Sequence, residues 1–159
     1  MPDAPALKIT DLRFRYPTPR EGEAFELSMP SLSLAQGEQM LLAARSGGGK
    51  STLLNLICGL MEPDSGCIEI AGQNIHSLRG PARDRFRGRS IGMVFQTFNL
   101  LTGFSAAENV MAAMMFSAIP ASEHRGRALE LLASLGISNP HEEAENLSVG
   151  QQQRVAAAR

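Results

Sequence analysis

The sequence predicts an α/β protein in which a mixed β-sheet surrounds one strand–loop–helix unit and a helical subdomain follows. In that unit an apolar run over residues 40–43 leads into three consecutive glycines, and apolar residues then recur at helical spacing over residues 53–60. The pattern changes near Gln96, since alternating, strand-like runs precede it and alanine- and leucine-rich helical runs follow. We therefore expect two domains, a core over residues 1–96 and a helical subdomain over residues 97–159.

Short apolar runs predict the strands of the core. Residues 12–34 hold two alternating runs joined by a turn at residues 18–23. The alternation of the second run slips at Pro30, which predicts a bulge or an edge strand. Residues 67–70 alternate in a short strand, and the continuous apolar run over residues 91–95 is typical of a strand buried on both faces.

Capping signals predict the helices of the second part. Ser105 and Glu108 have the spacing of a capping box before an alanine- and methionine-rich helix. The next helical pattern meets a stop signal at Gly136. Ser148 and Gln151 repeat the capping-box spacing, so we expect a last helix to begin there.

Composition excludes several classes of protein. The chain has 159 residues, 43% of them hydrophobic, and a net charge of -1, which gives no general attraction to nucleic acid. The arginine-rich residues 79–89 are interpreted as a solvated helix face, with nucleic-acid contact as the alternative. Cys58 and Cys67 are expected to be free thiols in a reducing compartment. Residues 1–8 do not resemble a signal peptide, and the longest apolar run, over residues 110–119, is too short to cross a bilayer.

The glycine-rich loop has the chemistry of a phosphate-binding P-loop. Gly47, Gly48 and Gly49 carry no Cβ atoms, so the backbone can curl with several N–H groups pointing inward. The helix that begins near Lys50 adds unpaired N–H groups and the positive end of its dipole. Lys50 supplies a mobile charge for the outer phosphates, and Ser51 supplies a hydroxyl for a magnesium ion.

One position departs from the P-loop pattern. The pattern G-x-x-x-x-G-K-[ST] places its first glycine at position 44, where this chain has Ala44. If the loop required a positive φ there, alanine would cost about 1 kcal/mol. The alternative is a glycine-rich turn that binds no ligand, but the Lys-Ser-Thr sequence that follows the glycines favours phosphate binding.

With these motifs in order, residues 7–159 resemble the nucleotide-binding subunit of an ABC transporter. Tyr16 resembles the aromatic residue that stacks on adenine, Gln96 resembles the Q-loop glutamine, and residues 147–151 resemble the LSGGQ signature. The Walker A loop is matched by Ala44, Arg45, Ser46, Gly47, Gly48, Gly49, Lys50, Ser51 and Thr52. Within the family, residues 91–100 look most like the lipoprotein-releasing and macrolide-export subunits.

The resemblance implies a P-loop NTPase core that binds ATP and Mg²⁺ and hydrolyses ATP to drive export or extraction of a substrate. It implies a transmembrane permease as partner, a location on the cytoplasmic face of the membrane, and a second nucleotide-binding subunit packed head to tail. Lys50 and Gln96 would be catalytic, and Ser51 and Gln96 would contact the metal. Ser148, Gly150 and Gln151 would face the γ-phosphate of the partner's ATP. Two alternatives stay open, a soluble ABC ATPase acting on nucleic acid or ribosomes and an inactive binding module.

Two further departures from the family concern the signature and the end of the chain. Val149 stands where the signature has its middle glycine. The family's apolar strand ending in Asp-Glu and its switch histidine have no counterpart here, so the chain resembles the front portion of an ATPase with its C-terminal part missing. We therefore expect poor ATP hydrolysis by this polypeptide alone.

The same resemblance predicts marginal stability. The family's strands after the signature helix lie in the centre of the sheet, and without them backbone polar groups and apolar surface are exposed. We expect the isolated 159-residue chain to be marginally stable or prone to aggregation. Circular dichroism melting and size-exclusion chromatography test this, and a sharp melt of a clean monomer would contradict it.

Overall fold

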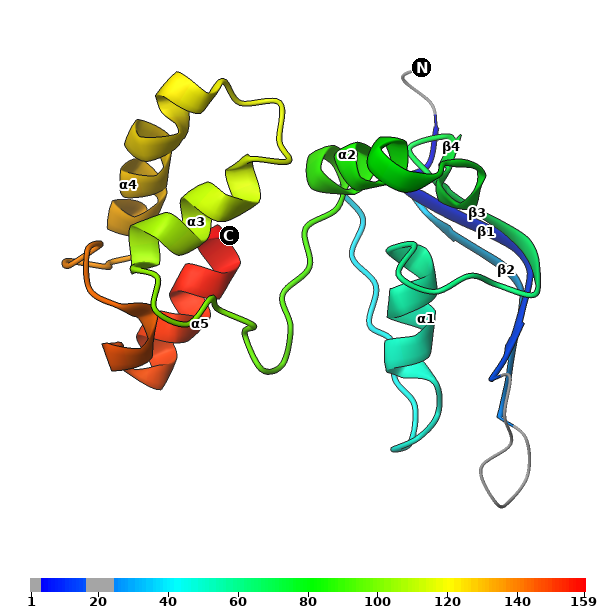
Figure 1. Ribbon diagram of the computed structural model, residues 1–159. Helices are drawn as coiled ribbons and strands as arrows, with labels where there is room; N and C mark the ends of the chain where they lie inside the picture. The colour runs from blue at the N-terminus through cyan, green and yellow to red at the C-terminus, as the bar shows by residue number, and fades with distance from the viewer. Residues whose placement is uncertain (1–3, 17–24) are drawn as a thin grey trace. The chain divides into compact units, whose positions relative to one another are not determined.

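A computed structural model describes residues 4–16 and 25–159 of the chain and divides it into two compact units (Figure 1). The first unit is Met1–Arg87 and the second is Gly88–Arg159. The division therefore falls upstream of Gln96, because residues 91–95 do not join the sheet of the first unit. The turn predicted over residues 18–23 lies outside the described residues.

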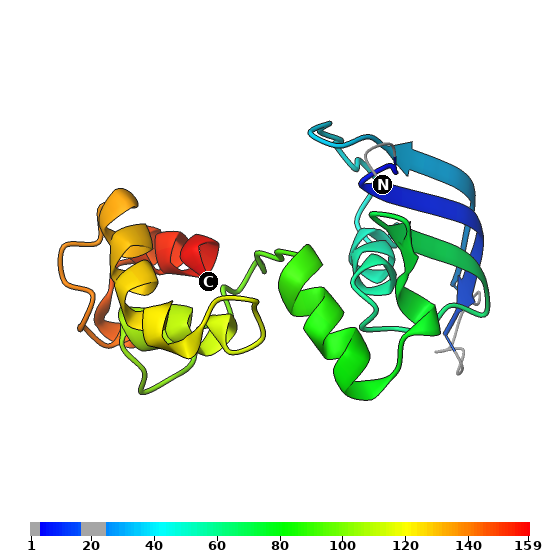
Figure 2. The same ribbon diagram turned by 90° about the horizontal axis from the view of Figure 1, so that it is seen from above.

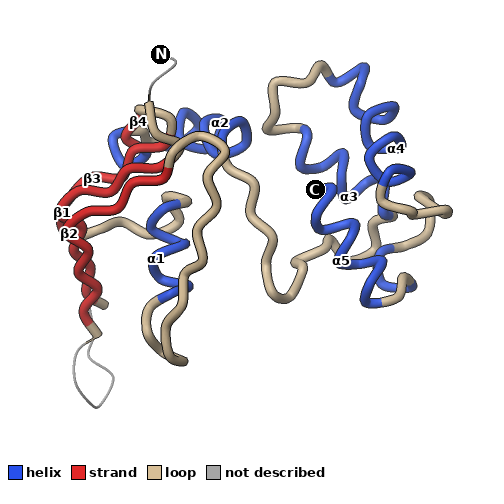
Figure 3. The backbone as a smooth tube through the Cα atoms, turned by 180° about the vertical axis from the view of Figure 1, so that it is seen from behind, coloured by secondary structure: helices blue, strands red, loops and turns tan. Residues whose placement is uncertain are grey.

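The first unit contains a sheet of order β2-β1-β3-β4 (Figure 3). Its strands are β1 (Leu7–Arg15), β2 (Glu26–Leu34), β3 (Ser65–Ile70) and β4 (Gln73–Asn74). Every pairing among these described strands is antiparallel, so the described sheet lacks the parallel pairs of the mixed sheet that we expected. β2 lies at one edge, as the proline within it predicted.

The two long strands change face half-way along their length. Asp11 has a positive φ of 47°, and the β1–β3 pairing shifts register at this point. The irregularity is therefore in β1, while β2 keeps one register with β1 on both sides of Pro30. As a result Ile9 and Leu12 are both buried although they are three positions apart. Gly66 permits this, since a Cβ atom there would lie 2.5 Å from the carbonyl oxygen of Asp11.

The structure contradicts two of the predicted strands. Residues 40–43 and 91–95 form no β-ladder, and Leu41 and Val94 are 90% and 59% exposed. A strand exists through hydrogen bonds to a neighbouring strand, and no described strand pairs with either segment. Hydrophobicity alone therefore overestimated the sheet.

Helix α1 (Lys50–Ile57) lies beside the sheet (Figures 1 and 2) and buries Leu53 and Leu56. A 3₁₀ turn, η1 (Ile75–Ser77), then leads to α2 (Gly80–Ser90), so the arginine-rich segment is helical as predicted. α2 contains no buried residue, as expected of a solvated face, although the side chain of Arg83 is only 13% exposed.

The second unit is a helical cluster. Its helices are α3 (Ala106–Met114), α4 (His124–Ser134) and α5 (Val149–Ala158), with 3₁₀ turns η2 (Ala121–Glu123) and η3 (Ala144–Asn146) between them. Val110, Leu132 and Val155, one from each helix, are fully buried in a common core. None of the described helices has both the length and the apolar character needed to cross a membrane.

The helix boundaries follow the predicted signals. The capping boxes of Ser105 with Glu108 and of Ser148 with Gln151 are both formed, at the starts of α3 and α5. Hydrogen bonds from the backbone N–H and side chain of Ser105 lower the pKa of Glu108. α4 ends before Gly136, which has a φ of 71°.

Asn109 is a fully buried polar residue that the sequence analysis did not single out. Its Oδ1 accepts from the backbone N–H of Leu101 at 2.7 Å. Its Nδ2 lies within hydrogen-bond distance of the carbonyl oxygens of Leu101, Phe104 and Ser105, at 3.2, 3.3 and 3.1 Å. One amide therefore fixes the loop that leads into α3.

Replacing this amide tests its role. Asn109→Ala removes the Asn109 partner of both the N–H and the carbonyl of half-buried Leu101, so we expect it to lower the free energy of unfolding by about 2–4 kcal/mol. Urea denaturation followed by circular dichroism measures the change. Asn139→Ala is the matched control, since the Asn139 side chain is exposed and bonds only to Glu142 among the described residues. Equal effects of the two substitutions would contradict this role.

Candidate nucleotide-binding site

The loop before α1 has the backbone of an anion-binding turn. Gly47 and Gly49 have φ values of 77° and 81°, in the left-handed region that glycine adopts without steric cost. Gly49 is the N-cap of α1. It also packs closely against the start of β2, because a Cβ atom there would lie 2.6 Å from the ring of Phe25, which precedes the strand, and 3.0 Å from Leu27 within it. Both conformation and space therefore require glycine at position 49.

The N-terminus of α1 presents backbone N–H groups that no described side chain caps. Within the loop, the Gly48 N–H donates to the Arg45 carbonyl at 3.0 Å. The Leu53 N–H donates to the Gly49 carbonyl at 2.8 Å, and no described side chain caps the helix before it. The first-turn N–H groups, over residues 50–52, therefore remain available, and the helix dipole adds partial positive charge. An anion fits this end of the helix.

Lys50 places a full positive charge at the same loop. Its Nζ donates to the carbonyl oxygens of Ala44 and Arg45 at 2.7 and 3.0 Å. An ammonium group has three N–H donors, so one remains for a ligand. Because the two bonds span the ends of the loop, Lys50 also helps to hold the turn closed.

Ala44 does not strain the loop. Among the described residues other than glycine, those with positive φ are Asp11, Ala71, Phe98 and Asn99, and Ala44 is not among them. Its methyl group lies beside Gly48, where an added Cβ atom would come within 3.0 Å of it. The departure from the glycine pattern at position 44 therefore carries no conformational cost.

Tyr16 lies at the first turn of α1, close to the loop. Its hydroxyl and the hydroxyl of Thr52 are 3.1 Å apart and hydrogen-bonded. The ring contacts Phe14 edge-on, with centroids 5.1 Å apart, and lies 5.8 Å from the ring of Phe25. Because Tyr16 is 47% exposed, part of its ring is open to a ligand.

Metal-binding groups are few in the described part of the chain. It contains no group of three or more His, Cys, Asp or Glu side chains that could hold a metal ion. Ser51 is exposed at the first turn of α1, beside the anion-binding amides, and its hydroxyl fits one position of a magnesium ion that phosphate oxygens also hold. Arg45 and Ser46 are exposed in the same loop.

The remaining predicted site residues belong to the second unit. Ser148 accepts from the Gln151 N–H at 3.4 Å, which leaves its own hydroxyl hydrogen available to a ligand. The side chain of Gln151 in turn accepts from the Ser148 N–H at 2.9 Å. Gly150 lies in the first turn of α5, and Gln96 is exposed in the segment between α2 and α3. The structure thus gathers Tyr16 and the loop in one unit and the signature residues in the other.

Comparison with known protein families identifies the family that carries this glycine-rich loop and signature sequence. The family described as "ABC transporter" matches the chain over residues 27–159. The chain belongs to the ABC transporter family. The α/β fold class and the resemblance inferred from the motifs are therefore confirmed, apart from the sheet, whose described strands pair only antiparallel.

Individual relatives support the assignment to the ABC family. The methionine import ATP-binding protein MetN of Brucella abortus is 42% identical over 98% of this chain, and the match spans 41% of MetN. The lipoprotein-releasing system ATP-binding protein LolD of Xanthomonas campestris is 44% identical over 80% of this chain, spanning 54% of LolD. A dimeric ATP-binding cassette, MJ0796, solved with ADP and Pi, is 30% identical with a TM-score of 0.72, and the match covers 96% of this chain and 67% of that one. The chain thus spans roughly half of the length of these curated relatives, or less.

Neither cysteine forms a disulfide with a described residue, in agreement with the expectation of thiols. Cys58 is buried and Cys67 is half-buried. Burial raises the pKa of both thiols, and the charge of Arg87 acts against this at Cys58. Neither thiol is therefore activated as a nucleophile.

Two substitutions distinguish the cost of a positive φ from the cost of a steric collision in the loop. Gly47→Ala meets no atom within 4 Å, so we expect only the cost of positive φ, about 1–2 kcal/mol. Gly49→Ala adds a collision with the Phe25 ring and should cost clearly more. Urea denaturation of both variants measures the difference. Equal losses of stability would show that the contact with β2 does not constrain position 49.

Proposed function

We propose that this chain binds ATP with Mg²⁺ and that the longer protein it belongs to hydrolyses ATP to drive transport of a substrate through a membrane permease. The observation that carries the proposal is the N-terminus of α1, where free amides and the Lys50 ammonium meet at a glycine-shaped loop. The proposal extends the family assignment from fold to activity.

Each group has a defined task in this proposal. The amides of the first turn of α1 hold the β- and γ-phosphates, and the free N–H of Lys50 reaches the outer oxygens. Ser51 would offer its hydroxyl to magnesium, which supplies positive charge against the phosphates, and a metal contact of Gln96 stays a prediction from the family resemblance. Tyr16, which is 47% exposed, would offer its aromatic ring to the adenine.

The signature residues are proposed to act on a second subunit. Ser148 and the amide of Gly150 stand at the N-terminus of α5, where a helix favours an anion. In a head-to-tail pair they would face the γ-phosphate bound by the partner's loop, while the permease would hold the pair at the inner face of the membrane. The dimeric state named for MJ0796 supports this arrangement.

A binding module without hydrolysis is the second candidate. Val149 is 70% exposed beside Ser148, so a branched side chain stands at the start of the helix that would meet the partner's nucleotide. A soluble ABC ATPase acting on nucleic acid has less support, because two arginines of α2, Arg83 and Arg87, are engaged in bonds within the chain.

Lys50→Ala tests the proposed site. The loss of charge-assisted hydrogen bonds, worth about 1.5–3 kcal/mol, should weaken ATP binding by roughly 10- to 100-fold. Isothermal titration calorimetry with ATP and Mg²⁺ measures the affinity.

The matched control is Lys8→Ala. Lys8 is a half-exposed lysine of β1, and its ammonium group lies 3.9 Å from the carboxylate of Glu69. Its loss should leave ATP affinity unchanged. Unchanged affinity in Lys50→Ala would refute the site, and ATP binding without turnover in the longer protein would favour the binding module.

A further inference from the structure

The first turn of α1 carries a buried hydroxyl group that is bonded to an aromatic residue outside the helix. Thr52 is 7% exposed and is the only buried polar residue among the described residues of the first unit. Its Oγ1 lies 3.1 Å from the hydroxyl oxygen of Tyr16, which is 36 positions earlier in the chain. A buried hydroxyl group without a hydrogen-bond partner is costly, so this bond has a structural reason. It also joins a half-exposed ring to the helix that begins at the phosphate loop.

The backbone that leads to the Tyr16 ring is held independently of this bond. Arg15 is the last residue of β1 and pairs with Glu26 of β2. The backbone N–H of Arg15 also donates to Asp64 Oδ2 at 2.8 Å. Because the end of the strand is fixed in this way, the direction of the Tyr16 ring is decided by rotation of its own side chain.

Two further aromatic rings limit that rotation on one side. The buried ring of Phe14 meets Tyr16 edge-on with centroids 5.1 Å apart, and the ring of Phe25 lies 5.8 Å away. Phe25 in turn packs against Gly49, the N-cap of α1. These contacts support part of the Tyr16 ring, and its remaining surface stays open, since the residue is 47% exposed.

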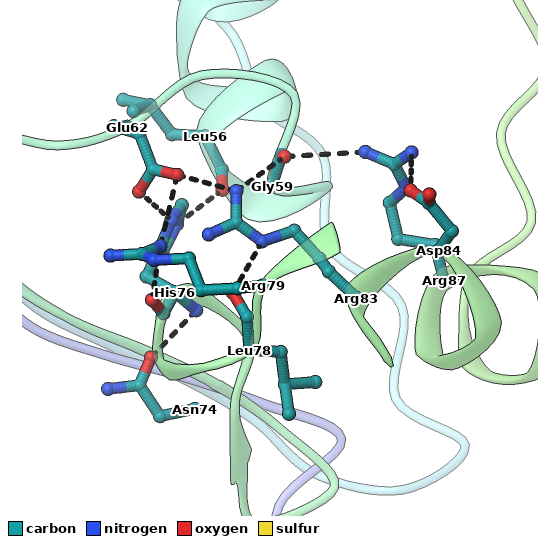
Figure 4. Close-up of polar contacts among 10 residues, drawn as sticks. All are labelled: Leu56, Gly59, Glu62, Asn74, His76, Leu78, Arg79, Arg83, Asp84 and Arg87. Carbon is teal, nitrogen blue, oxygen red and sulfur yellow. Dashed lines mark hydrogen bonds and ion pairs between the residues drawn. The ribbon is translucent and has the colours of Figure 1, made fainter. Parts of the chain in front are cut away.

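The helix on the other side of the hydroxyl bond is a firm support. α1 buries the side chains of two leucines. At its C-terminal end His76 Nε2 lies 2.9 Å from the Leu56 carbonyl oxygen (Figure 4). Arg83 and Arg87 donate to the Gly59 carbonyl just beyond the helix, at 3.5 and 3.4 Å. The exposed tyrosine ring is therefore the more mobile partner of the bond, and the helix holds it.

We propose that the hydroxyl bond to Thr52 fixes the Tyr16 ring as the platform for the adenine, so that one turn of α1 positions both the phosphates and the base. This deepens the proposed function and rests on the ATP site described above. Thr52 lies among the first-turn amides, over residues 50–52, that would hold the phosphates. The base of a nucleotide is joined to its phosphates through one ribose, so a ring bonded to this turn is within its reach. Thr52 is in this sense a positioning residue.

The bond matters because it holds the ring before the nucleotide arrives. An exposed aromatic side chain that turns freely loses conformational freedom when it stacks on a base, and that loss weakens binding. A ring that already has a hydrogen bond to α1 has lost this freedom on folding. Removal of the hydroxyl group should therefore weaken the contribution of adenine and leave the binding of the phosphates unchanged.

Two ligands and one substitution separate these contributions. Isothermal titration calorimetry measures the Kd values of MgATP and of magnesium tripolyphosphate, which has no base, for the full 159-residue chain. Tyr16→Phe keeps the ring and removes only the hydroxyl group. We expect it to weaken MgATP binding by about 2- to 10-fold, the worth of one neutral hydrogen bond, and to leave tripolyphosphate affinity unchanged.

Variants at the other partner identify the bond itself. Thr52→Val removes the hydroxyl group and keeps the branched shape, and in its background Tyr16→Phe should have no further effect on MgATP affinity. Thr52→Ser keeps the hydroxyl group and should bind MgATP as the wild type does. Thr10→Val is the matched control, since Thr10 is an exposed threonine of β1, and it should change neither affinity. Tyr16→Phe alters an exposed group, so the central comparison does not depend on the folding of Thr52→Val.

Each result decides either the bond or the site. Equal MgATP affinities of the wild type and Tyr16→Phe overturn the positioning role, as do independent, additive effects of Tyr16→Phe and Thr52→Val. Equal losses for MgATP and tripolyphosphate in Tyr16→Phe also overturn it, because a merely structural hydroxyl group would affect both ligands alike. In all these cases the wild type still binds MgATP, and the proposed function stands. A wild type that binds neither ligand refutes the proposed ATP site, and the positioning role with it.

Discussion

The site depends on the asymmetry of α1. The Leu56 carbonyl in its last turn lies against an imidazole, and the Gly59 carbonyl just beyond its end accepts from two guanidinium groups, whereas its N-terminal amides follow a glycine that offers no side-chain cap. α3 and α5 show the contrast, because Ser105 and Ser148 cap their first turns. A helix with uncapped amides in its first turn is completed by water or by a ligand. The first-turn amides of α1 are thus left available to a ligand.

This asymmetry is maintained by close contacts around the helix. Gly49 brings the loop against the Phe25 ring in a space that a methyl group would fill. The hydroxyl of Tyr16 bonds to Thr52 in the first turn. At the other end Gly59 lies against Ile75, where a Cβ atom would approach within 3.0 Å. The helix is therefore held at both ends, and its short length makes its amides rigidly placed donors.

Local chemistry in the sequence was sufficient to predict the loop and the caps. Lys50, the glycines before it and the two capping boxes act within a few residues of chain, so their spacing carries the information. Contacts between segments that are distant in sequence could not be predicted from local spacing. Arg83 was predicted as part of a solvated face because its partner, Glu62, lies in a turn far from it in sequence. Asn109 broke an apolar helix pattern, which was the available signal for its buried role.

The strand predictions failed for a related reason. Alternation and hydrophobicity describe what a strand needs on its faces, but a ladder also needs a neighbour at its edges. β1 and β2 pair with one another. They keep the same register on both sides of Asp11, where the positive φ changes which face of the sheet the side chains occupy. Residues 40–43 and 91–95 carry the apolar side chains without any described strand beside them, so the backbone stays outside the sheet.

The positions where this chain departs from the family's glycine pattern are explained by backbone conformation. Gly47 and Gly49, which the chain retains, have φ values of 77° and 81° that a side chain would strain. Ala44 and Val149, which replace glycines of the family motifs, are not among the described residues with positive φ. Val149 is the first residue of α5 and has ordinary helical conformation. Glycine is therefore kept where the backbone is left-handed and is replaced where any residue can adopt the required φ, so neither substitution by itself disrupts the fold of its motif.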